Sequence, residues 1–397
     1  MRRLLMIPGP SEVDSRVIQA CVRPSISHLD PEFIEVMDET CRMLGKIFQT
    51  KSEIIPLVSS GRGGIEAALV SSLEPGERVL IVSNGVFCNM ITSIAKRVGT
   101  VPVVVKYEPG KKMDLTKIED AIKKNSIKAI AAVHSETSTG MLNPAQEIGK
   151  IAKQYNLIYI LDCISSLGGV DVRPDEWGVD ICVTASQKCL ASLPGLAILS
   201  INDRMWDIFE QRETPIQSFY FDLSRWKLMW IPKEQGGKVI YGYRRMPLTA
   251  STHVFYALNE ACKEILEEGL SQRFERHQRI AKAVRKALRR IGIEIFPEPG
   301  LESPTLTAFL PPEKVNEYDI RKIMKQEYGI AIADGLEEFY GKMLRVGHMG
   351  NTASMEYVVP TISALEITLR ELGVNVEIGA GVDTLLQSIE RASKTRI

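Results

Sequence analysis

The sequence predicts an α/β fold in which helices cover both faces of a mostly parallel sheet and a smaller α+β domain follows. From about residue 54 to residue 200, short β-branched runs alternate with helical stretches, which is typical of βαβ units and of a sheet buried on both faces. The chain also has 397 residues, which is long for a single hydrophobic core and indicates two domains.

The expected elements of the first domain follow this alternation. Strands are expected at Val79–Ser83, Val101–Tyr107, Ala129–His134, Leu157–Asp162, Ile181–Thr184 and Leu196–Ser200. Helices are expected between them, at Gly64–Leu73, Asn89–Arg97, Leu115–Lys124 and Gln146–Tyr155. Ligands of such folds bind beyond the carboxyl ends of the strands, where His134, Asp162 and Lys188 fall.

The second half of the chain has a different pattern. A polar, tryptophan-rich stretch at residues 213–237 precedes a long helical segment from about Thr252 to Ile291. The remainder predicts strands near Glu294–Phe296, Thr305–Phe309 and Met343–Gly347, a helix at Tyr318–Tyr328 and a long final helix from Met355. We therefore expect an N-terminal segment (1–15) packed near the site and the small domain, a large domain (16–260) and a small C-terminal domain (261–397).

The composition excludes several classes of protein. Lysine and arginine number 49, aspartate and glutamate also 49, so the net charge of zero argues against nucleic acid or anionic membranes as main partners. No run approaches the roughly 18 apolar residues of a membrane span, and the apolar start MRRLLMI breaks at Pro8, too early for a signal peptide. The seven cysteines form no CxxC pair, which favours reduced thiols in a cytoplasmic protein over a disulfide or zinc framework.

Asp162 and Lys188 are the most informative pair of side chains. They lie 26 positions apart, each at the end of an apolar run. An acid and an amine at the ends of neighbouring strands suit a pyridine-ring cofactor, because the acid pairs with the ring nitrogen and the amine forms a Schiff base with the aldehyde. Ile164 is expected against one face of that ring. A turn-capping aspartate and a surface lysine are the structural alternatives for the two residues taken singly.

Other motifs gain weight beside that pair. The turn SSGRGG at residues 59–64 precedes a helical run, and a helix N-terminus offers free N–H groups to a phosphate, although a simple strand-to-helix turn is the alternative. Phe87 is an aromatic suited to stacking on a flat ring or to core packing. Arg345, inside a strand-like run, suits a bidentate grip on a carboxylate or a structural salt bridge. His134 alone is typical of a buried, hydrogen-bonded histidine.

In this order and spacing, the motifs resemble the fold-type I, class V pyridoxal-phosphate aminotransferases, in the alanine/serine–glyoxylate (serine–pyruvate) branch. The resemblance covers nearly the whole chain and rests on IPGPSEV, SSGRGGIEAALV, SNGVF, HSETSTG, LDCISSLGG, ASQKCLASLPG, SFYFDLSRW and GKMLRVGHMG. It implies a large domain with a mostly parallel seven-stranded sheet and a smaller α+β domain.

The resemblance also implies roles for individual residues. Lys188 corresponds to the Schiff-base lysine and Asp162 to the partner of the pyridine nitrogen. Cofactor contacts are implied for Ser60, Gly61, Arg62, Phe87, Thr137, Ile164 and Gln187, and substrate contacts for Arg345 and Gly9. The family is homodimeric, and a neighbouring subunit supplies a tyrosine and a threonine to the phosphate. Here the threonine is Thr249, whereas the tyrosine position is Met246, with Tyr243 or Arg244 as substitutes.

These implications lead to one expected activity and several alternatives. A ping-pong transaminase would move an amino group from alanine or serine to glyoxylate or pyruvate, with pyridoxal phosphate as cofactor. The tail LRVGHMGNTASMEYVVPTISALEITL is also similar to pyridoxamine–pyruvate aminotransferase, although the Ser60–Arg62 turn argues for a phosphate-bearing cofactor. A cysteine desulfurase is disfavoured because no cysteine follows Cys262. A nucleotide-binding module without catalysis is disfavoured by the lack of a GxGxxG motif after the first strand.

Overall fold

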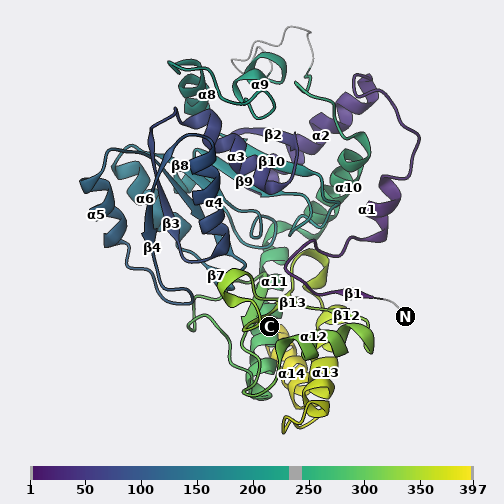
Figure 1. Ribbon diagram of the computed structural model, residues 1–397. Helices are drawn as coiled ribbons and strands as arrows, with labels where there is room; N and C mark the ends of the chain where they lie inside the picture. Colours follow the sequence, from purple (N-terminus) through teal and green to yellow (C-terminus); the bar gives the residue numbers. More distant parts are fainter. Residues whose placement is uncertain (1–2, 232–243, 395–397) are drawn as a thin grey trace.

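The protein consists of a large unit built on one central sheet and a smaller unit that contains both ends of the chain that can be traced (Figure 1). The computed structural model describes residues 3–231 and 244–394. The large unit lies above in Figure 1, and helices α11 to α14 of the small unit lie below it.

Seven strands form the central sheet in the order β2-β10-β9-β8-β5-β3-β4, and all neighbours are parallel except the two pairs that contain β10. The expected mostly parallel seven-stranded sheet is therefore confirmed. Its strands are β2 (Glu53–Val58), β3 (Arg78–Ser83), β4 (Val101–Lys106), β5 (Ile127–Val133), β8 (Ile158–Asp162), β9 (Ile181–Ala185) and β10 (Leu196–Ile201). Strand β2 was not predicted from the sequence. It contains Pro56, and a proline in a sheet is confined to an edge strand, which is the position that β2 occupies.

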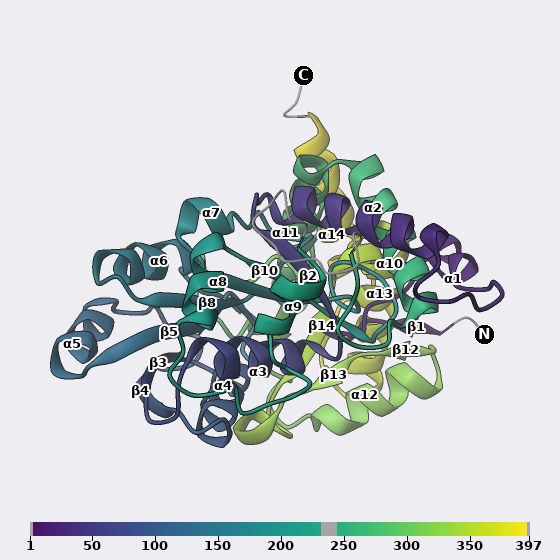
Figure 2. The ribbon, with the colours of Figure 1, turned by 90° about the horizontal axis from the view of Figure 1, so that it is seen from above.

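Helices cover both faces of this sheet (Figure 2). On one face lie α3 (Gly61–Ser72) and α4 (Val86–Arg97), and on the other lie α5 (Thr116–Lys124) and α6 (Ala145–Gln154). The remaining helices of the large unit are α1 (Ser15–Ala20), α2 (Pro31–Phe48), α7 (Pro174–Trp177), α8 (Asp203–Glu210), α9 (Ser224–Met229) and α10 (Thr252–Glu268). A short hairpin joins β6 (Ser135–Glu136) and β7 (Met141–Leu142) directly after β5.

The small unit packs helices against a three-stranded antiparallel sheet in the order β11-β14-β13. Its elements are α11 (Leu270–Arg290), β11 (Leu306–Phe309), α12 (Glu317–Gln326), β12 (Ile330–Ala331), β13 (Ala333–Asp334), η2 (Glu337–Phe339), β14 (Leu344–Gly347), η3 (Gly350–Thr352), α13 (Met355–Glu371) and α14 (Ala380–Lys394). The N-terminal strand β1 (Leu4–Leu5) pairs in parallel with β12, so the start of the chain belongs to this unit.

Three expected elements differ from the structure. The long helix from Thr252 to Ile291 is two helices, because Gly269, at a φ of +83°, ends α10 and turns the chain into α11. The final helix is likewise two helices, separated by residues 372–379. The strand expected near Glu294–Phe296 is reduced to one bridge between Ile295 and Phe309.

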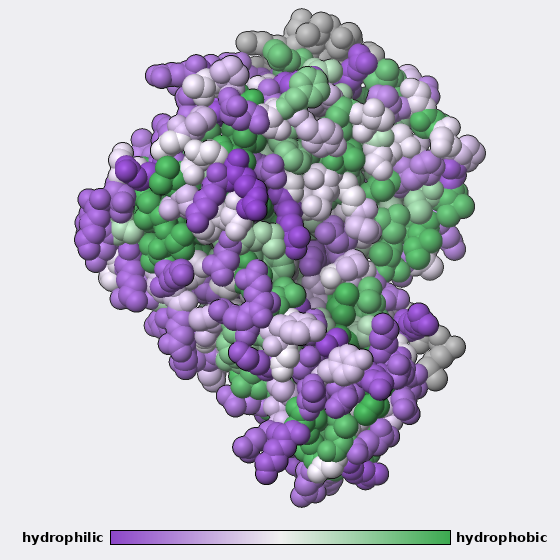
Figure 3. Space-filling view, in the orientation of Figure 1, coloured by the Kyte–Doolittle hydropathy of each residue, from purple (hydrophilic) through white to green (hydrophobic). Residues whose placement is uncertain are grey.

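The large and the small unit each have a hydrophobic core of their own. The first surrounds the central sheet, and its buried members run from Phe33 to Ile265. The second is formed by Met6 together with residues between Ile280 and Leu385. Polar side chains dominate the face seen in Figure 3, where apolar patches interrupt them. Within the described residues, no helix combines the length and the apolar character that crossing a membrane requires.

Two helical glycines provide a test of how tightly α3 packs on the sheet. A Cβ at Gly64 would lie 2.8 Å from Val183 Cγ1 and 3.0 Å from Ala197 Cβ, whereas a Cβ at Gly45 in α2 would meet nothing closer than 3.8 Å. We expect Gly64→Ala to lower the free energy of unfolding by about 1–3 kcal/mol, because the core has no room for the methyl group. Gly45→Ala should raise it by about 0.5–1 kcal/mol through helix propensity. Urea midpoints measure both changes, and equal shifts in the two variants would contradict the packing argument.

Candidate active site

A cavity of about 450 Å³ lies at the carboxyl ends of the central strands, between the large and the small unit. The N-terminal segment, the starts of α3 and α4, the ends of β8 and β9, and strands β13 and β14 all contribute to its wall. It brings together the predicted residues Gly9, Ser60, Gly61, Arg62, Phe87, Thr137, Asp162, Ile164, Gln187, Lys188 and Arg345. Thr249, for which a cofactor contact was predicted, does not line it.

Asp162 ends β8, and its carboxyl group is buried in the cavity wall. One oxygen accepts a hydrogen bond from the backbone N–H of Ile164 at 2.8 Å. Burial raises the pKa of Asp162 to about 7, since the charged form loses its hydration, although the Ile164 N–H opposes this effect. A cation placed against this carboxyl group would restore its charged form.

Lys188 follows β9 and reaches the cavity beside the N-terminal segment. Its Nζ donates to the backbone carbonyl of Pro8, and burial lowers its pKa to about 8. A lysine with this pKa is partly neutral near pH 8 and is therefore a better nucleophile than an exposed lysine. Gly9, at a φ of +101°, passes so close that any Cβ would collide with the lysine side chain.

Ser11 fixes the backbone of the lysine loop. Its hydroxyl donates to the Lys188 carbonyl at 2.7 Å, and its N–H donates to the Gln187 carbonyl at 2.9 Å. The N-terminal segment is thus tied directly to the loop that carries the amine. The motif IPGPSEV contains Pro8 and Ser11, but neither residue was predicted from the sequence to make a contact.

The predicted phosphate turn forms the first turn of α3. Ser60 is the N-cap residue, and the N–H groups of Gly61, Arg62 and Gly63 have no acceptor among the described residues. Gly61 allows the helix to approach the sheet, because a Cβ would lie 2.5 Å from Ile164 Cδ1. Arg62 lines the cavity, and its exposed side chain forms no hydrogen bond or ion pair with the part of the chain that the structure describes.

Gln187 adds a buried polar group to the same wall. Its side-chain oxygen Oε1 has no hydrogen-bond partner among residues 3–231 and 244–394. Rotation of the terminal amide would present its NH₂ group instead, which donates to an anion. Free helix N–H groups, an unpaired guanidinium and an unpartnered amide in one wall suit a phosphate group.

Arg345 lies on β14 at the other side of the cavity and is 5% exposed. Its Nε donates to the Asp334 carbonyl at 2.7 Å and its Nη1 to the Thr137 carbonyl at 3.1 Å, while Nη2 makes no hydrogen bond within the described chain. Burial lowers the pKa of Arg345 to about 10. Backbone carbonyls orient this guanidinium without neutralising it, so it can still pair with a carboxylate.

Phe87 and Thr137 line the cavity from neighbouring loops. The N–H groups of Phe87 and Cys88, in the first turn of α4, donate to Glu136 Oε2 at 3.0 and 3.1 Å. The fully buried Glu136 also accepts from the hydroxyl of Ser138 at 2.6 Å. It therefore fixes the backbone at the start of α4, from which the Phe87 side chain extends. Glu136 belongs to the motif HSETSTG but was given no role from the sequence.

His134 does not line the cavity, as expected of a structural histidine. It is buried, its Nδ1 lies 3.0 Å from Ser166 Oγ, and its ring packs edge-on against Trp177.

The residues expected to contact a second subunit differ in their exposure and in their contacts. Thr249 is exposed, so it remains a prediction for a contact with another chain. Met246 is buried in the large core, and Arg244 pairs with Asp38 and Glu53 of its own chain. Tyr243 lies outside the described residues. Neither Met246 nor Arg244 is therefore placed to reach a neighbouring site.

The fold and the cavity define a pyridoxal-phosphate enzyme of fold type I. One cavity combines free N–H groups at the start of α3, a buried carboxyl group, a lysine of lowered pKa and a partly free arginine. These residues fit the phosphate, the ring nitrogen and the aldehyde of the cofactor.

Comparisons with known proteins agree with this class of enzyme. The family model described as "Aminotransferase class-V" matches residues 11–350, and the chain belongs to this family. It is similar to the crystal structure of ureidoglycine–glyoxylate aminotransferase from Bacillus subtilis, with a TM-score of 0.92, 34% identity and 98% of each chain covered. It is 31% identical to alanine–glyoxylate aminotransferase of Rattus norvegicus, over 94% of this chain and 89% of that protein.

A third comparison corresponds to the similarity noted in the tail. Pyridoxamine–pyruvate aminotransferase from Mesorhizobium loti matches with a TM-score of 0.89 and 26% identity, over 98% of this chain and 97% of that chain. The class V assignment makes the protein a pyridoxal-phosphate-dependent aminotransferase, which acts on amino acids and oxo acids.

The raised pKa of Asp162 predicts a pH-dependent stability of the protein without cofactor. Between the ordinary aspartate pKa of about 3.9 and the folded value of about 7, the folded state binds the extra proton, so stability falls as pH rises through this window. Asp162→Asn keeps an acceptor for Ile164 N–H and removes the charge. We expect the variant to be more stable than the wild type at pH 8, by at most about 4 kcal/mol, and equally stable near pH 4.

Thermal midpoints of both proteins, stripped of cofactor and compared from pH 4 to pH 9, measure this effect. A difference that does not change with pH would refute the assigned titration. In the presence of pyridoxal phosphate the order should reverse, because the variant lacks the charge that pairs with the ring nitrogen.

Proposed function

We propose that this aminotransferase moves the amino group of alanine or serine to glyoxylate or pyruvate in two half-reactions. The observation that carries the proposal is the position of Arg345, a single oriented guanidinium that shares one cavity with Lys188 and Asp162. The names of the relatives from Bacillus subtilis and Rattus norvegicus, both of which include glyoxylate, support a small oxo acid.

Each residue has a distinct task in this scheme. Bound pyridoxal phosphate supplies an aldehyde for the amine and an electron-poor ring that accepts the electrons of the broken Cα–H bond. Lys188 would hold the cofactor through its amine and, once an amino acid substrate has taken its place, would act as the base and then the acid for the substrate proton. Its lowered pKa, about 8, suits both capture and release of that proton. Asp162 keeps the ring nitrogen protonated.

Arg345 holds the substrate carboxylate beside Lys188. Its two hydrogen bonds to backbone carbonyls fix the plane of the guanidinium, so that a bound amino acid presents its Cα toward the lysine. The cavity of about 450 Å³ receives cofactor and substrate together, which favours a small side chain. Ile7, Met90 and Leu336 give part of the wall an apolar character, which favours a substrate with a small apolar side chain.

The alternatives fit the site less well. A free vitamer as substrate, as the name of the Mesorhizobium loti protein indicates for that enzyme, would leave the free N–H groups of α3 and the guanidinium of Arg62 without an anion. A desulfurase needs a mobile nucleophilic cysteine, whereas the last cysteine of this chain, Cys262, is buried in the large core.

We also propose a cytoplasmic homodimer. Thr249 is exposed and does not line its own cavity, which is consistent with a contact to the partner's cofactor. Figure 3 shows an apolar area over α1, where Ile18 and Val22 are 47% and 77% exposed. Such side chains favour association with another chain. The seven free cysteines are consistent with a reducing compartment.

Replacement of the lysine tests the catalytic assignment. We expect Lys188→Ala to abolish turnover and the visible absorption of the cofactor–lysine bond, because no other amine in the described cavity wall replaces it. Absorption spectra before and after addition of alanine measure the second effect. Retention of both activity and spectrum would refute the assignment.

Replacement of the arginine tests the substrate assignment. Arg345→Gln should raise KM for alanine by about 10- to 100-fold, which corresponds to the loss of a charge-assisted hydrogen bond of about 1.5–3 kcal/mol. Affinity for pyridoxal phosphate should be unchanged, because Arg345 faces the substrate. Steady-state kinetics and cofactor titration measure the two effects, and a loss confined to cofactor affinity would contradict the role.

A further inference from the structure

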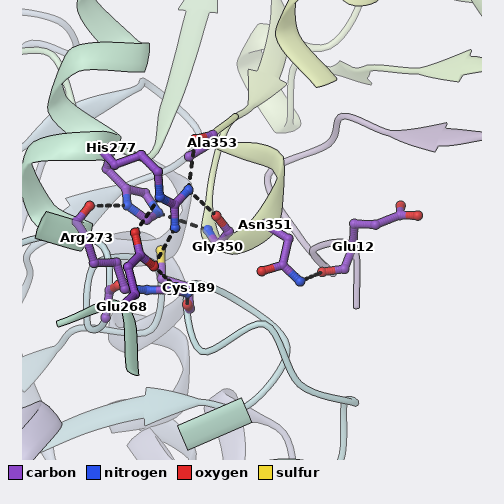
Figure 4. Close-up of polar contacts among 10 residues, drawn as sticks. Glu12, Cys189, Glu268, Arg273, His277, Gly350, Asn351 and Ala353 are labelled. Atoms are coloured by element: carbon purple, nitrogen blue, oxygen red, sulfur yellow. Dashed lines mark hydrogen bonds and ion pairs between the residues drawn. The ribbon is translucent and has the colours of Figure 1, made fainter. Parts of the chain in front are cut away.

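The loops that carry Asp162, Lys188 and Arg345 converge on the start of helix α11. Arg273 contacts the backbone of Gly168, in the loop after Asp162, and of Cys189, next to Lys188. Arg276 and His277 contact the backbone of Gly350, in the turn after the Arg345 strand. Figure 4 shows Arg273, His277 and Glu268 together with Cys189, Gly350 and Ala353.

Arg273 joins the two loops of the large unit. This 3% exposed side chain donates from Nε to the Gly168 carbonyl and from Nη2 to the Cys189 carbonyl, both at 2.8 Å. Its third nitrogen, Nη1, pairs with Glu268 at 2.6 Å. One guanidinium therefore sets the spacing between the loop after Asp162 and the residue next to Lys188.

Arg276 joins the same carboxylate to the small unit. It pairs with both oxygens of Glu268 at 2.5 and 2.9 Å. Its Nη1 donates to the carbonyls of Gly350 and Ala353 at 3.0 and 2.8 Å. These carbonyls belong to the turn that directly follows the Arg345 strand.

His277 completes the junction from the next position on α11. Its Nδ1 donates to the Arg273 carbonyl at 2.8 Å, so Nε2 is the acceptor for the Gly350 N–H at 2.9 Å. Gly350 is close to the lysine loop itself, since a Cβ there would lie 2.9 Å from Ala191 Cβ and 3.5 Å from the Lys188 carbonyl oxygen. No atom of Glu268, Arg273, Arg276 or His277 lines the cavity.

We propose that Glu268, Arg273 and Arg276 form a positioning cluster that sets the distance between the cofactor-holding residues and the arginine that binds the substrate carboxylate. Arg273 serves the cofactor side, and Arg276 serves the carboxylate side. The part of the proposal that concerns Arg276, here called the carboxylate half, rests on the proposed role of Arg345. The part that concerns Arg273, the cofactor half, does not.

The two arginines therefore predict different defects. Arg276→Met releases the Gly350 and Ala353 carbonyls but leaves Arg273 paired with Glu268. We expect it to weaken the binding of propionate, a carboxylate without an amino group, by tenfold or more, while the dissociation constant for pyridoxal phosphate changes less than twofold. Titrations followed by the visible spectrum of the holoenzyme and by the protein fluorescence of the apoenzyme measure the two constants.

Arg290→Met is the matched control. Arg290 lies on the same helix and pairs only with Glu377 on the surface among the described residues, with side chains 52% and 73% exposed. Both constants should stay within twofold of the wild type. Unchanged propionate binding in Arg276→Met, an equal loss of cofactor affinity, or an equal loss in the control would overturn the carboxylate half.

Arg273→Lys tests the cofactor half without a buried cavity. A lysine side chain cannot contact the Gly168 carbonyl, the Cys189 carbonyl and the Glu268 carboxylate at once. We therefore expect the visible absorption of the cofactor bound to Lys188, titrated with pH in the absence of substrate, to have a midpoint shifted by at least 0.5 of a pH unit. A folded variant with an unaltered midpoint would overturn it. If this lysine variant does not fold, Glu268→Gln supplies the same measurement, because it weakens the ion pair and keeps the hydrogen-bond acceptor.

Failure of the proposed function and failure of the positioning cluster give different experimental results. A wild-type enzyme that binds propionate but does not react with alanine or serine would refute the donor assignment and leave the cluster standing. A wild-type enzyme that binds no propionate would refute the role of Arg345 and the carboxylate half, whereas the spectral midpoint of Arg273→Lys still decides the cofactor half.

Discussion

Burial of the Asp162 carboxyl group is the constraint on which the rest of the site depends. Burial around the same cavity disfavours the charged forms of three groups: it raises the pKa of Asp162 to about 7 and lowers that of Lys188 to about 8 and that of Arg345 to about 10. A ligand that directs a cation to Asp162 and a carboxylate to Arg345 stabilises both charged forms at once. Lys188, for which the neutral form is chemically useful, needs no such compensation. Electrostatic complementarity to cofactor and substrate is thus a direct result of how deeply the strand ends are buried.

Much of the fold and of the cavity could be predicted because local signals were strong. Alternating strands and helices defined the sheet, and Asp162, Lys188 and the glycine turn at α3 carry their chemistry in short motifs. The edge strand β2 was missed because Pro56 and its position at the sheet edge weaken the usual pattern. The break at Gly269 was missed because one glycine within an amphipathic run does not reveal whether the helix continues.

The residues that sequence analysis overlooked act through backbone atoms or through distant partners. Ser11 contacts the carbonyls of Gln187 and Lys188, which are more than 170 positions away along the chain. Arg273 and Arg276 lie within the helical segment expected from Thr252 to Ile291 and were given no role there, yet Arg273 is buried and both donate to carbonyls of other loops. A carbonyl acceptor leaves no mark on its own residue type, so such contacts become visible only in three dimensions. The prediction for Thr249 is of another kind, because it concerns a contact with the cofactor of a second subunit.

The N-terminal segment shows why the two units of the chain must be treated as one site. It starts in the small unit, where β1 pairs with β12 and the Met6 carbonyl accepts from Gly347 N–H at 2.8 Å. It then crosses the cavity at Pro8 and Gly9 and ends at Ser11 on the lysine loop. Asn351, in the turn after the Arg345 strand, donates to the Glu12 carbonyl at 3.4 Å, as Figure 4 shows. The Arg345 strand is therefore linked to Lys188 by two routes, one through this segment and one through α11. Because both routes end on backbone atoms next to Lys188, a displacement of the small unit that moves Arg345 must also move the lysine or break one of these contacts.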